Sequence, residues 1–178
     1  YPNPNIKGFT TNPTLMQKAG VTDYVAYSKE ILAVIPDRPI SFEVFSDDFE
    51  EMYKQAIEIA SWGKNVCVKI PVTNTKGEPS GDLVKKLVQK NVNLNVTALF
   101  TVKQVEDVVS WLQGTTSSCI SVFAGRVADT GRDPLPIMKR ALEIMKPYPE
   151  IELIWASPRE LLNIFQANAA IIIHNAYY

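Results

Sequence analysis

Short apolar runs alternate along this chain with longer amphipathic segments. The segments repeat apolar residues every three or four positions, which is typical of helices with one buried face. The runs are short and rich in β-branched residues, which predicts strands. Seven such runs are predicted to be strands: Ile6–Thr10, Pro39–Val44, Asn65–Val72, Val92–Leu99, Cys119–Ala124, Ile151–Ala156 and Ala170–His174. Regular alternation of strand and helix predicts one α/β domain over residues 1–178, with a parallel sheet and helices outside it.

Capping residues predict where several helices begin and end. Gly63 and Gly114 follow the helical patterns FEEMYKQAIEIASW and VKQVEDVVSWLQ, in the position where glycine commonly ends a helix. Polar residues and prolines mark the beginnings. The predicted starting positions are Asp47 and Asp48, Asp82, Thr101, Asp133 with Pro134, and Pro158 in the first turn of the last helix.

The number and spacing of the strands favour a closed barrel over an open sheet. A complete (β/α)8 TIM barrel has eight strands in roughly 250 residues. We therefore expect residues 1–178 to hold such a barrel without its first strand–helix unit and without its last helix.

Polar side chains alternate with apolar ones inside four of these strands. Residues two apart on a strand point the same way, so the apolar set can pack under helices while the polar set projects into the barrel. Each polar group buried without a partner costs about 1–3 kcal/mol, which predicts a functional interior rather than a passive core. The alternative is an antiparallel sheet whose polar face meets water, but the helix between every two strands argues against it. The interior set is Ser41, Glu43, Lys69, Asn95, Thr97 and Ser121.

Lys69 is the most informative member of this set. It lies in mid-strand between VCV and IPV, and burial disfavours the ammonium form of a lysine. A neutral amine can attack a carbonyl and form an iminium. The alternative is a buried ion pair with Glu43, which would contribute little to stability. We favour a nucleophile, with Glu43 as a candidate proton carrier.

Two arginines are expected at the carboxyl ends of the strands, where barrel enzymes hold their substrates. Arg126 lies in SVFAGRVAD, and Arg159 follows Ser157 in ASPRE at a predicted helix start. Either arginine alone would more often form a surface ion pair, but two guanidinium groups converging with Ser157 on a helix N-terminus favour a phosphate group. For Arg132 we expect an ion pair with the adjacent Asp133.

Composition narrows the range of functions. A net charge of -1 argues against broad binding to nucleic acid or to an anionic membrane. No apolar run approaches the roughly 20 residues that span a bilayer.

Cys67 and Cys119 are predicted to be buried thiols, which is consistent with a cytoplasmic protein. With one histidine and no cluster of cysteines or histidines, we expect no metal site and no cofactor.

Six motifs, in order and in register, resemble those of the transaldolase family. They extend over nearly the whole chain from Lys7 to about Phe165: GFTTNPTL (residues 8–15), SFEV (41–44), VKIPVT (68–73), NLNVTALFT (93–101), SVFAGR (121–126) and ASPRE (156–160). Any one motif is weak, but six in register are specific.

The resemblance implies a class I aldol mechanism in the pentose phosphate pathway, with Lys69 as the Schiff-base lysine. A ketose phosphate such as fructose 6-phosphate or sedoheptulose 7-phosphate would be cleaved, and its dihydroxyacetone unit would pass from Lys69 to an aldose phosphate. In the family an aspartate on the first strand is a general acid–base, and residues 1–178 match the family from its second strand onward.

The resemblance also implies roles for individual residues. Glu43 and Thr97 match the pair that handles a catalytic water, and Asn12 and Asn95 match the asparagines that hold the donor hydroxyls. Thr10 lies in the same motif as Asn12, and Ser121 resembles the serine that lines the donor site. Arg126, Ser157 and Arg159 match the phosphate-binding residues.

Two alternatives stay open. The related fructose-6-phosphate aldolases release free dihydroxyacetone and carry glutamine and tyrosine where this chain has Glu43 and Phe123, so these two residues favour a transaldolase. A non-catalytic sugar-phosphate-binding barrel fragment is the third hypothesis. Family members range from dimers to larger rings, so a homo-oligomer is possible. His174 is more consistent with a structural than a catalytic role.

Overall fold

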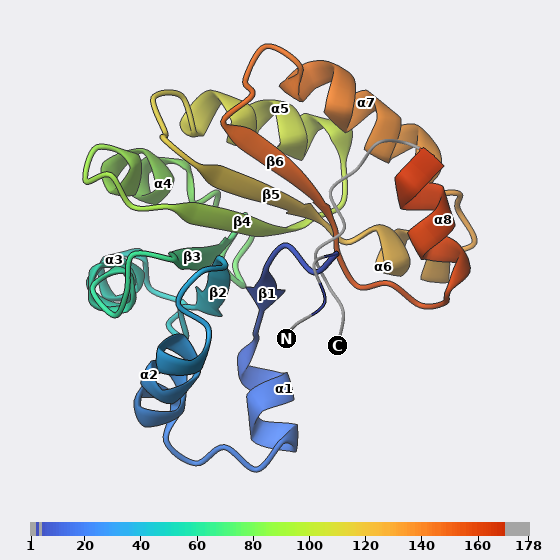
Figure 1. The fold of residues 1–178 in the computed structure, drawn as a ribbon. Coiled ribbons are helices and arrows are strands. Elements are labelled where there is room, and N and C mark those ends of the chain that lie inside the picture. Colours follow the sequence, from blue (N-terminus) through green and yellow to red (C-terminus); the bar gives the residue numbers. More distant parts are fainter. Residues whose placement is uncertain (1–2, 4, 170–178) are drawn as a thin grey trace.

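The computed structural model describes residues 3 and 5–169, and within them six strands form one parallel sheet. The strands pair in chain order, each with the next, and the sheet curls as consecutive strands of a (β/α)8 barrel (Figure 1). The predicted parallel sheet and barrel architecture are therefore confirmed. The strands are β1 (Phe9–Thr10), β2 (Ile40–Glu43), β3 (Val66–Pro71), β4 (Leu94–Leu99), β5 (Ser118–Val122) and β6 (Ile151–Trp155).

Helices connect these strands and lie around the outside of the curled sheet (Figure 1). Along the outer layer α3 packs on α4, α4 on α5, and α5 on α7. The helices are α1 (Pro13–Lys18), α2 (Tyr24–Val34), α3 (Phe49–Ala60), α4 (Gly81–Val88), α5 (Val102–Trp111), α6 (Ala124–Asp129), α7 (Leu135–Met145) and α8 (Leu162–Ala169).

The strand predictions differ from the structure mainly at their ends. The first strand is only two residues long because it begins at Phe9, three residues later than predicted. It ends at Thr10 as predicted, just before Asn12 caps α1 by accepting a hydrogen bond from the backbone N–H of Leu15 at 2.9 Å. The fifth run ends at Val122, because Ala124 begins α6. The predicted strand Ala170–His174 lies outside the described residues.

The alternation within the strands divides the sheet into two faces, as predicted. On the outer face, Ile40 and Phe42 of β2 and Val68 and Ile70 of β3 are completely buried beneath helices. They belong to one apolar cluster that continues through β4, β5 and the inner sides of α3, α4, α5 and α7. This continuous core lies outside the barrel, so the polar positions of the same strands are left to face its interior.

Two of the predicted helix starts are confirmed by hydrogen bonds. The carboxylate of Asp48 accepts from the backbone N–H groups of Glu50 and Glu51, both at 3.0 Å. Thr101 and Gln104 form a reciprocal capping box at the start of α5.

Two other predicted helix starts are wrong. Helix α4 begins at Gly81 after Ser80, so Asp82 already lies inside its first turn. Helix α8 begins at Leu162, because Ser157 has a left-handed backbone (φ 57°) and Pro158 belongs to a loop.

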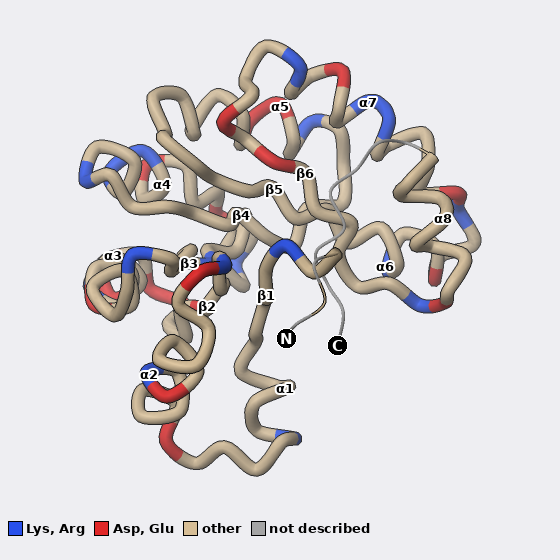
Figure 2. Tube along the Cα trace, viewed as in Figure 1, with Lys and Arg blue, Asp and Glu red and all other residues tan. Residues whose placement is uncertain are grey.

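Charged residues of both signs are interspersed along the outer helices (Figure 2). Most of the ion pairs among the described residues are exposed, for example Lys54 with Glu51 and Arg140 with Glu143. Such pairs contribute little to stability, typically about 0–1 kcal/mol. No helix within residues 3 and 5–169 is long and apolar enough to cross a membrane.

Removal of the capping box should destabilise the fold measurably. We expect Thr101→Ala to lower the free energy of unfolding by about 1 kcal/mol, because the first turn of α5 loses its side-chain acceptor. Urea unfolding followed by circular dichroism would measure the change. Thr22→Ala, at an exposed position before α2, is the matched control and should change the same quantity by less than about 0.5 kcal/mol. Equal effects of the two substitutions would contradict the prediction.

Candidate active site

A cleft of about 690 Å³ opens at the carboxyl ends of the strands. Its walls come from every strand of the sheet or from the loop that follows it, which is where barrel enzymes hold their substrates. Ten of the eleven candidate site residues predicted from the sequence line it, Asn95 being the exception, and residues of α1 complete the wall. The predicted residues that line the cleft are Thr10, Asn12, Glu43, Lys69, Thr97, Ser121, Phe123, Arg126, Ser157 and Arg159.

Lys69 lies on the floor of this cleft. Its side chain is only 10% exposed, and its Nζ lies 3.2 Å from Oε2 of Glu43, whose side chain is 22% exposed. The same amine donates a hydrogen bond of 2.9 Å to the backbone carbonyl of Thr11. Both acceptors therefore hold the amine inside the barrel, with its polar end turned toward the cleft.

The strand register explains why the amine and the carboxylate meet. Glu43 of β2 is the direct neighbour of Lys69 in the parallel ladder, and Lys69 is in turn the neighbour of Asn95 on β4. Side chains at neighbouring ladder positions project from the same face of a sheet. The ion pair is therefore a consequence of the register, and it is compatible both with the nucleophile and with the ion-pair alternative for Lys69.

Asn95 lies deeper than the cleft and is almost completely buried. Its Nδ2 donates to Oγ of Ser41 at 3.0 Å, and its Oδ1 accepts from Oγ of Ser121 at 2.7 Å. This chain of hydrogen bonds joins β2, β4 and β5 across the interior. Because both ends of the amide have protein partners here, the role in donor binding that the resemblance implies for Asn95 stays a prediction.

The end of β4 has an irregular backbone beside the cleft. The register of β4 against β5 shifts between Val96 and Leu99, and Ala98 has a left-handed backbone with φ 65°. That conformation costs about 1–2 kcal/mol for a residue with a Cβ. The irregularity lies immediately after Thr97, which is buried and lines the cleft.

The two predicted arginines both lie at the rim of the cleft, but with different partners. The guanidinium of Arg126 lies 4.6 Å from the centre of the Phe123 ring, in a cation–π contact. Arg159 donates from Nε and Nη2 to the carboxylate of Asp129, with the shortest contact at 2.6 Å. The Arg159 guanidinium also lowers the pKa of Asp129 below its usual value, through this hydrogen bond and through its charge.

The predicted ion pair between Arg132 and Asp133 is not found. The carboxylate of Asp133 instead accepts from the backbone N–H of Leu135 at 2.9 Å.

A close backbone contact brings the two arginine loops together. A Cβ on Gly125, next to Arg126, would lie 1.5 Å from the carbonyl oxygen of Ser157. The backbone N–H of Gly125 donates to the carbonyl of Ala156 at 3.3 Å. Only a residue without a side chain allows this contact, so Gly125 is required for the loops after β5 and β6 to lie side by side.

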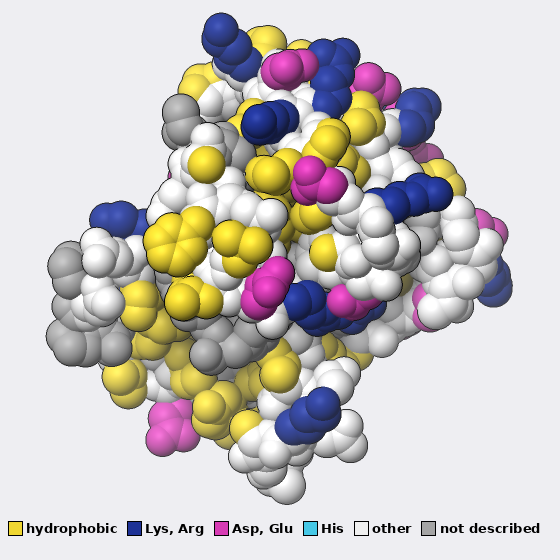
Figure 3. All heavy atoms as spheres, turned by 90° about the vertical axis from the view of Figure 1, so that its right-hand side faces the viewer, with side chains coloured by type: hydrophobic (Ala, Val, Ile, Leu, Met, Phe, Trp, Pro, Cys, Tyr) yellow, Lys and Arg dark blue, Asp and Glu magenta, His cyan; other side chains and the backbone are white. Residues whose placement is uncertain are grey.

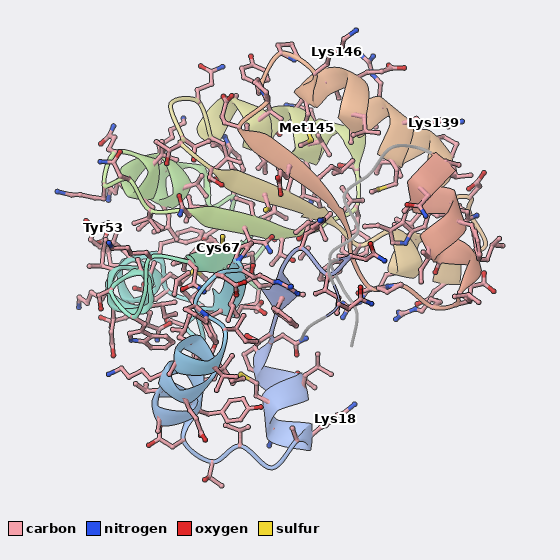
Figure 4. All side chains as sticks on the ribbon, in the orientation of Figure 1. Lys18, Tyr53, Cys67, Lys139, Met145 and Lys146 are labelled. Carbon is pink, nitrogen blue, oxygen red and sulfur yellow. The ribbon has the colours of Figure 1, made fainter. Side chains whose placement is uncertain are left out.

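Sequence reasoning missed two residues that shape the cleft. The side chain of Asn163 accepts from the backbone N–H groups of Arg159 and Glu160, at 2.8 and 3.2 Å, and so holds the loop before α8. Lys18 lines the cleft from the last turn of α1, where Figure 4 labels it. The signal for Lys18 was its place in the helix that Asn12 caps, one turn beyond the GFTTNPTL motif.

The side of the molecule that carries α6 and α8 combines exposed apolar and charged side chains (Figure 3). Leu161, Leu162 and Phe165 are more than half exposed there. The Arg159–Asp129 pair lies next to them in the fold, because Asp129 ends α6 and Arg159 precedes α8.

Both cysteines are free thiols, as predicted, with Cys67 buried and Cys119 only partly buried. Burial raises the pKa of the Cys67 thiol to about 11, with a smaller contribution from the charge of Glu152. Burial also raises the pKa of Cys119, and the neighbouring Cys67 and Glu152 add to the effect. Figure 4 labels Cys67 near the inner strands. Within the part of the chain that the structure describes, no group of three histidine, cysteine or acidic residues could hold a metal ion.

Comparison with known proteins assigns the family. The sequence model of the family "Transaldolase/Fructose-6-phosphate aldolase" matches residues 1–174. The chain belongs to this family. A "Probable transaldolase" of Dehalococcoides mccartyi is 38% identical over 163 residues, which are 91% of this chain and 72% of that protein. Proteins with the same name from Thermoanaerobacter sp. and Methanococcus maripaludis are 37% and 33% identical, each over 91% of this chain and 71% of the relative.

The two thiols should be almost inert in the folded protein. We expect iodoacetamide at pH 8 to label Cys67 at least about 100-fold more slowly than a cysteine in the urea-unfolded chain, because only the thiolate reacts and burial suppresses it. Labelling of Cys67 should accelerate as the pH rises toward about 11, the pKa of this thiol. Peptide mass spectrometry would follow each cysteine. Rapid labelling of the folded protein at pH 8 would contradict the buried placement.

The close contact at Gly125 gives a second test. We expect Gly125→Ala to lower the free energy of unfolding by about 1–3 kcal/mol, because the added methyl group must displace backbone rather than a flexible side chain. Gly63→Ala is the matched control, since the atoms nearest to its Cβ would belong to side chains, Oδ1 of Asn65 at 3.2 Å and the methyl groups of Leu32 at 3.6 and 3.7 Å. Urea unfolding would compare the two variants. A smaller loss for Gly125→Ala than for Gly63→Ala would contradict the contact.

Proposed function

We propose that this protein is a transaldolase of the pentose phosphate pathway. It would transfer a dihydroxyacetone unit from fructose 6-phosphate or sedoheptulose 7-phosphate to an aldose phosphate, through a Schiff base on Lys69. The observation that carries the proposal is the buried amine of Lys69 on the floor of an open cleft, 3.2 Å from the carboxylate of Glu43. The family and its transaldolase relatives support the same reaction.

The ion pair supports a route for the first proton. The Lys69 amine must be neutral to attack the C2 carbonyl of the ketose. Glu43 can take the proton, since its Oε2 lies within reach of Nζ. The attack forms a carbinolamine, and Glu43 can then return the proton to the departing hydroxyl as water leaves and the iminium forms. Thr97, which also lines the cleft, is proposed to hold this water together with Glu43.

The iminium would then serve as an electron sink for cleavage of the C3–C4 bond. The electron pair of that bond moves toward the iminium nitrogen, which leaves an enamine on Lys69 and releases an aldose phosphate. The C4 hydroxyl must lose its proton in this step. In the family an aspartate on the strand preceding the counterpart of β1 takes that role. The enamine then attacks the aldehyde of the second aldose phosphate, and hydrolysis frees Lys69.

The rim of the cleft suits the phosphate end of these sugars. Arg126 and Arg159 come from the loops after β5 and β6, and the Gly125 contact holds those loops together. Guanidinium groups bind phosphate through paired hydrogen bonds. A phosphate would have to share Arg159 with Asp129, which already accepts two of its donors. We therefore propose Arg126, Ser157 and Arg159 as the phosphate-binding residues, and Asn12, Thr10, Asn95, Ser121 and Phe123 as the residues around the carbon chain.

Fructose-6-phosphate aldolase is the second candidate, because the family description covers both activities. The two reactions share the Schiff base and differ in the fate of the three-carbon unit. Glu43 and Phe123 favour transfer, since the aldolases carry glutamine and tyrosine at these positions.

Borohydride trapping would test the reaction directly. We expect fructose 6-phosphate with borohydride to leave an adduct of dihydroxyacetone size on Lys69, identified by peptide mass spectrometry. Lys69→Met should abolish the adduct, because it keeps the shape of the side chain and removes the amine. Lys139→Met is the matched control on the outer side of α7 (Figure 4) and should keep the adduct.

The outcomes separate the three hypotheses. Adduct formation with transfer only when an aldose phosphate is added supports the transaldolase. Release of free dihydroxyacetone without any acceptor would select the aldolase. Absence of an adduct, or an adduct on another lysine, would reject both enzymes and leave a sugar-phosphate-binding protein.

A further inference from the structure

Tyr24, the first residue of α2, makes a double contact with the backbone of Glu43. Its hydroxyl accepts a hydrogen bond from the backbone N–H of Glu43 at 3.0 Å. The same hydroxyl lies 3.4 Å from the Glu43 carbonyl oxygen, to which it donates. Helix α2 is separated from Glu43 by the whole α2–β2 connection, so this contact is a tertiary one between residues 19 positions apart.

The contact replaces a bond that the β-ladder would otherwise make. Between β1 and β2, Phe9 donates to the Pro39 carbonyl and Thr11 donates to the Ser41 carbonyl. In a parallel ladder the next bond would run from the N–H of Glu43 to the carbonyl of Thr11. In this structure the N–H of Glu43 goes to Tyr24, and the carbonyl of Thr11 accepts from Nζ of Lys69 at 2.9 Å.

Aromatic packing holds the ring of Tyr24 in the position where its hydroxyl meets the Glu43 backbone. It packs edge-on against Phe42 and Phe45, with ring centres 6.2 and 4.6 Å away, and lies 5.9 Å from the ring of Trp62. Asp23 caps the helix directly before it. Burial raises the pKa of Tyr24 above its usual value, against smaller lowering effects from Thr11 and the Glu43 backbone. The hydroxyl therefore keeps its proton at neutral pH and can both accept and donate.

We propose that Tyr24 is a positioning residue for the Schiff-base site. By taking the place of the ladder bond at Glu43, it frees the Thr11 carbonyl for the Lys69 amine and holds the Glu43 carboxylate beside that amine. This inference rests on the proposed function for its effect on turnover, although the hydrogen-bond exchange itself does not depend on the substrate. Tyr24 does not line the cleft and acts only through Glu43 and Thr11.

Tyr24→Phe is the variant that tests the proposal, because it keeps the packed ring and removes only the hydroxyl. We expect kcat for dihydroxyacetone transfer to fall roughly 10-fold while KM changes less than about twofold, since the loss affects proton transfer at Lys69 rather than sugar binding. Tyr27→Phe, at a half-exposed position one turn along α2, is the matched control and should leave both constants within about twofold.

A double-mutant cycle with Glu43→Gln distinguishes positioning from general destabilisation. If Tyr24 acts through Glu43, adding Tyr24→Phe to Glu43→Gln should lower kcat by less than about a further twofold. Full additivity of the two losses would overturn the proposal. Loss of kcat that tracks a lowered melting temperature, equally in both backgrounds, would overturn it as well.

A measurement without sugar keeps this test separate from the proposed function. Formaldehyde with cyanoborohydride methylates neutral amines, and peptide mass spectrometry can compare Lys69 with the exposed Lys29 of α2 in the same sample. We expect the rate of Lys69 methylation relative to Lys29 to change about threefold in Tyr24→Phe, because the N–H of Glu43 then competes for the Thr11 carbonyl and the Lys69 amine loses the hydrogen bond that orients it. An unchanged ratio would overturn the positioning role, whether or not the wild-type protein forms a sugar adduct.

Discussion

The arrangement of the interior depends on the Lys69 amine, held between the Glu43 carboxylate at 3.2 Å and the Thr11 carbonyl at 2.9 Å. A lysine inside a barrel loses its hydration, and only such partners offset that cost. The two partners come from different strands, so the amine also ties β3 to β2 and to the end of β1. The same contacts aim the amine at the cleft, which connects the stability of the interior with its proposed chemistry.

The rest of the site is built in layers around that amine. Below it, Ser41, Asn95 and Ser121 form a hydrogen-bonded chain that satisfies the buried polar groups of three strands. Above it, the loops after β5 and β6 meet at the Gly125–Ser157 contact and bring Arg126 and Arg159 to one rim. The reactive end and the charged end of a sugar phosphate would thus be recognised by separate parts of the fold. Both parts rest on the same parallel register.

Local strain is concentrated near this cleft. Ala98 and Ser157 both have left-handed backbones, and both line it. Tyr24 replaces a ladder bond at Glu43, so the regular hydrogen bonding of β1 and β2 also ends there. Departures of this kind persist only where the surrounding packing holds them. Their position suits a site in which backbone groups and side chains must be presented to a ligand instead of to each other.

The sequence by itself determined the parallel α/β architecture and the interior face, because periodicities of two and of three to four are local properties of a chain. It also identified Glu43, Lys69 and Thr97 as neighbours in one interior, since alternation leaves them on the same side of successive strands. Only the tertiary structure decided which groups the site residues bond to. In the fold, Asn95 bonds to Ser41 and Ser121, Arg159 pairs with Asp129, and Tyr24 bonds to Glu43. These contacts depend on distances between residues 19 to 54 positions apart. No local pattern encodes such distances, because they follow from how the strands curl and how the helices pack against them.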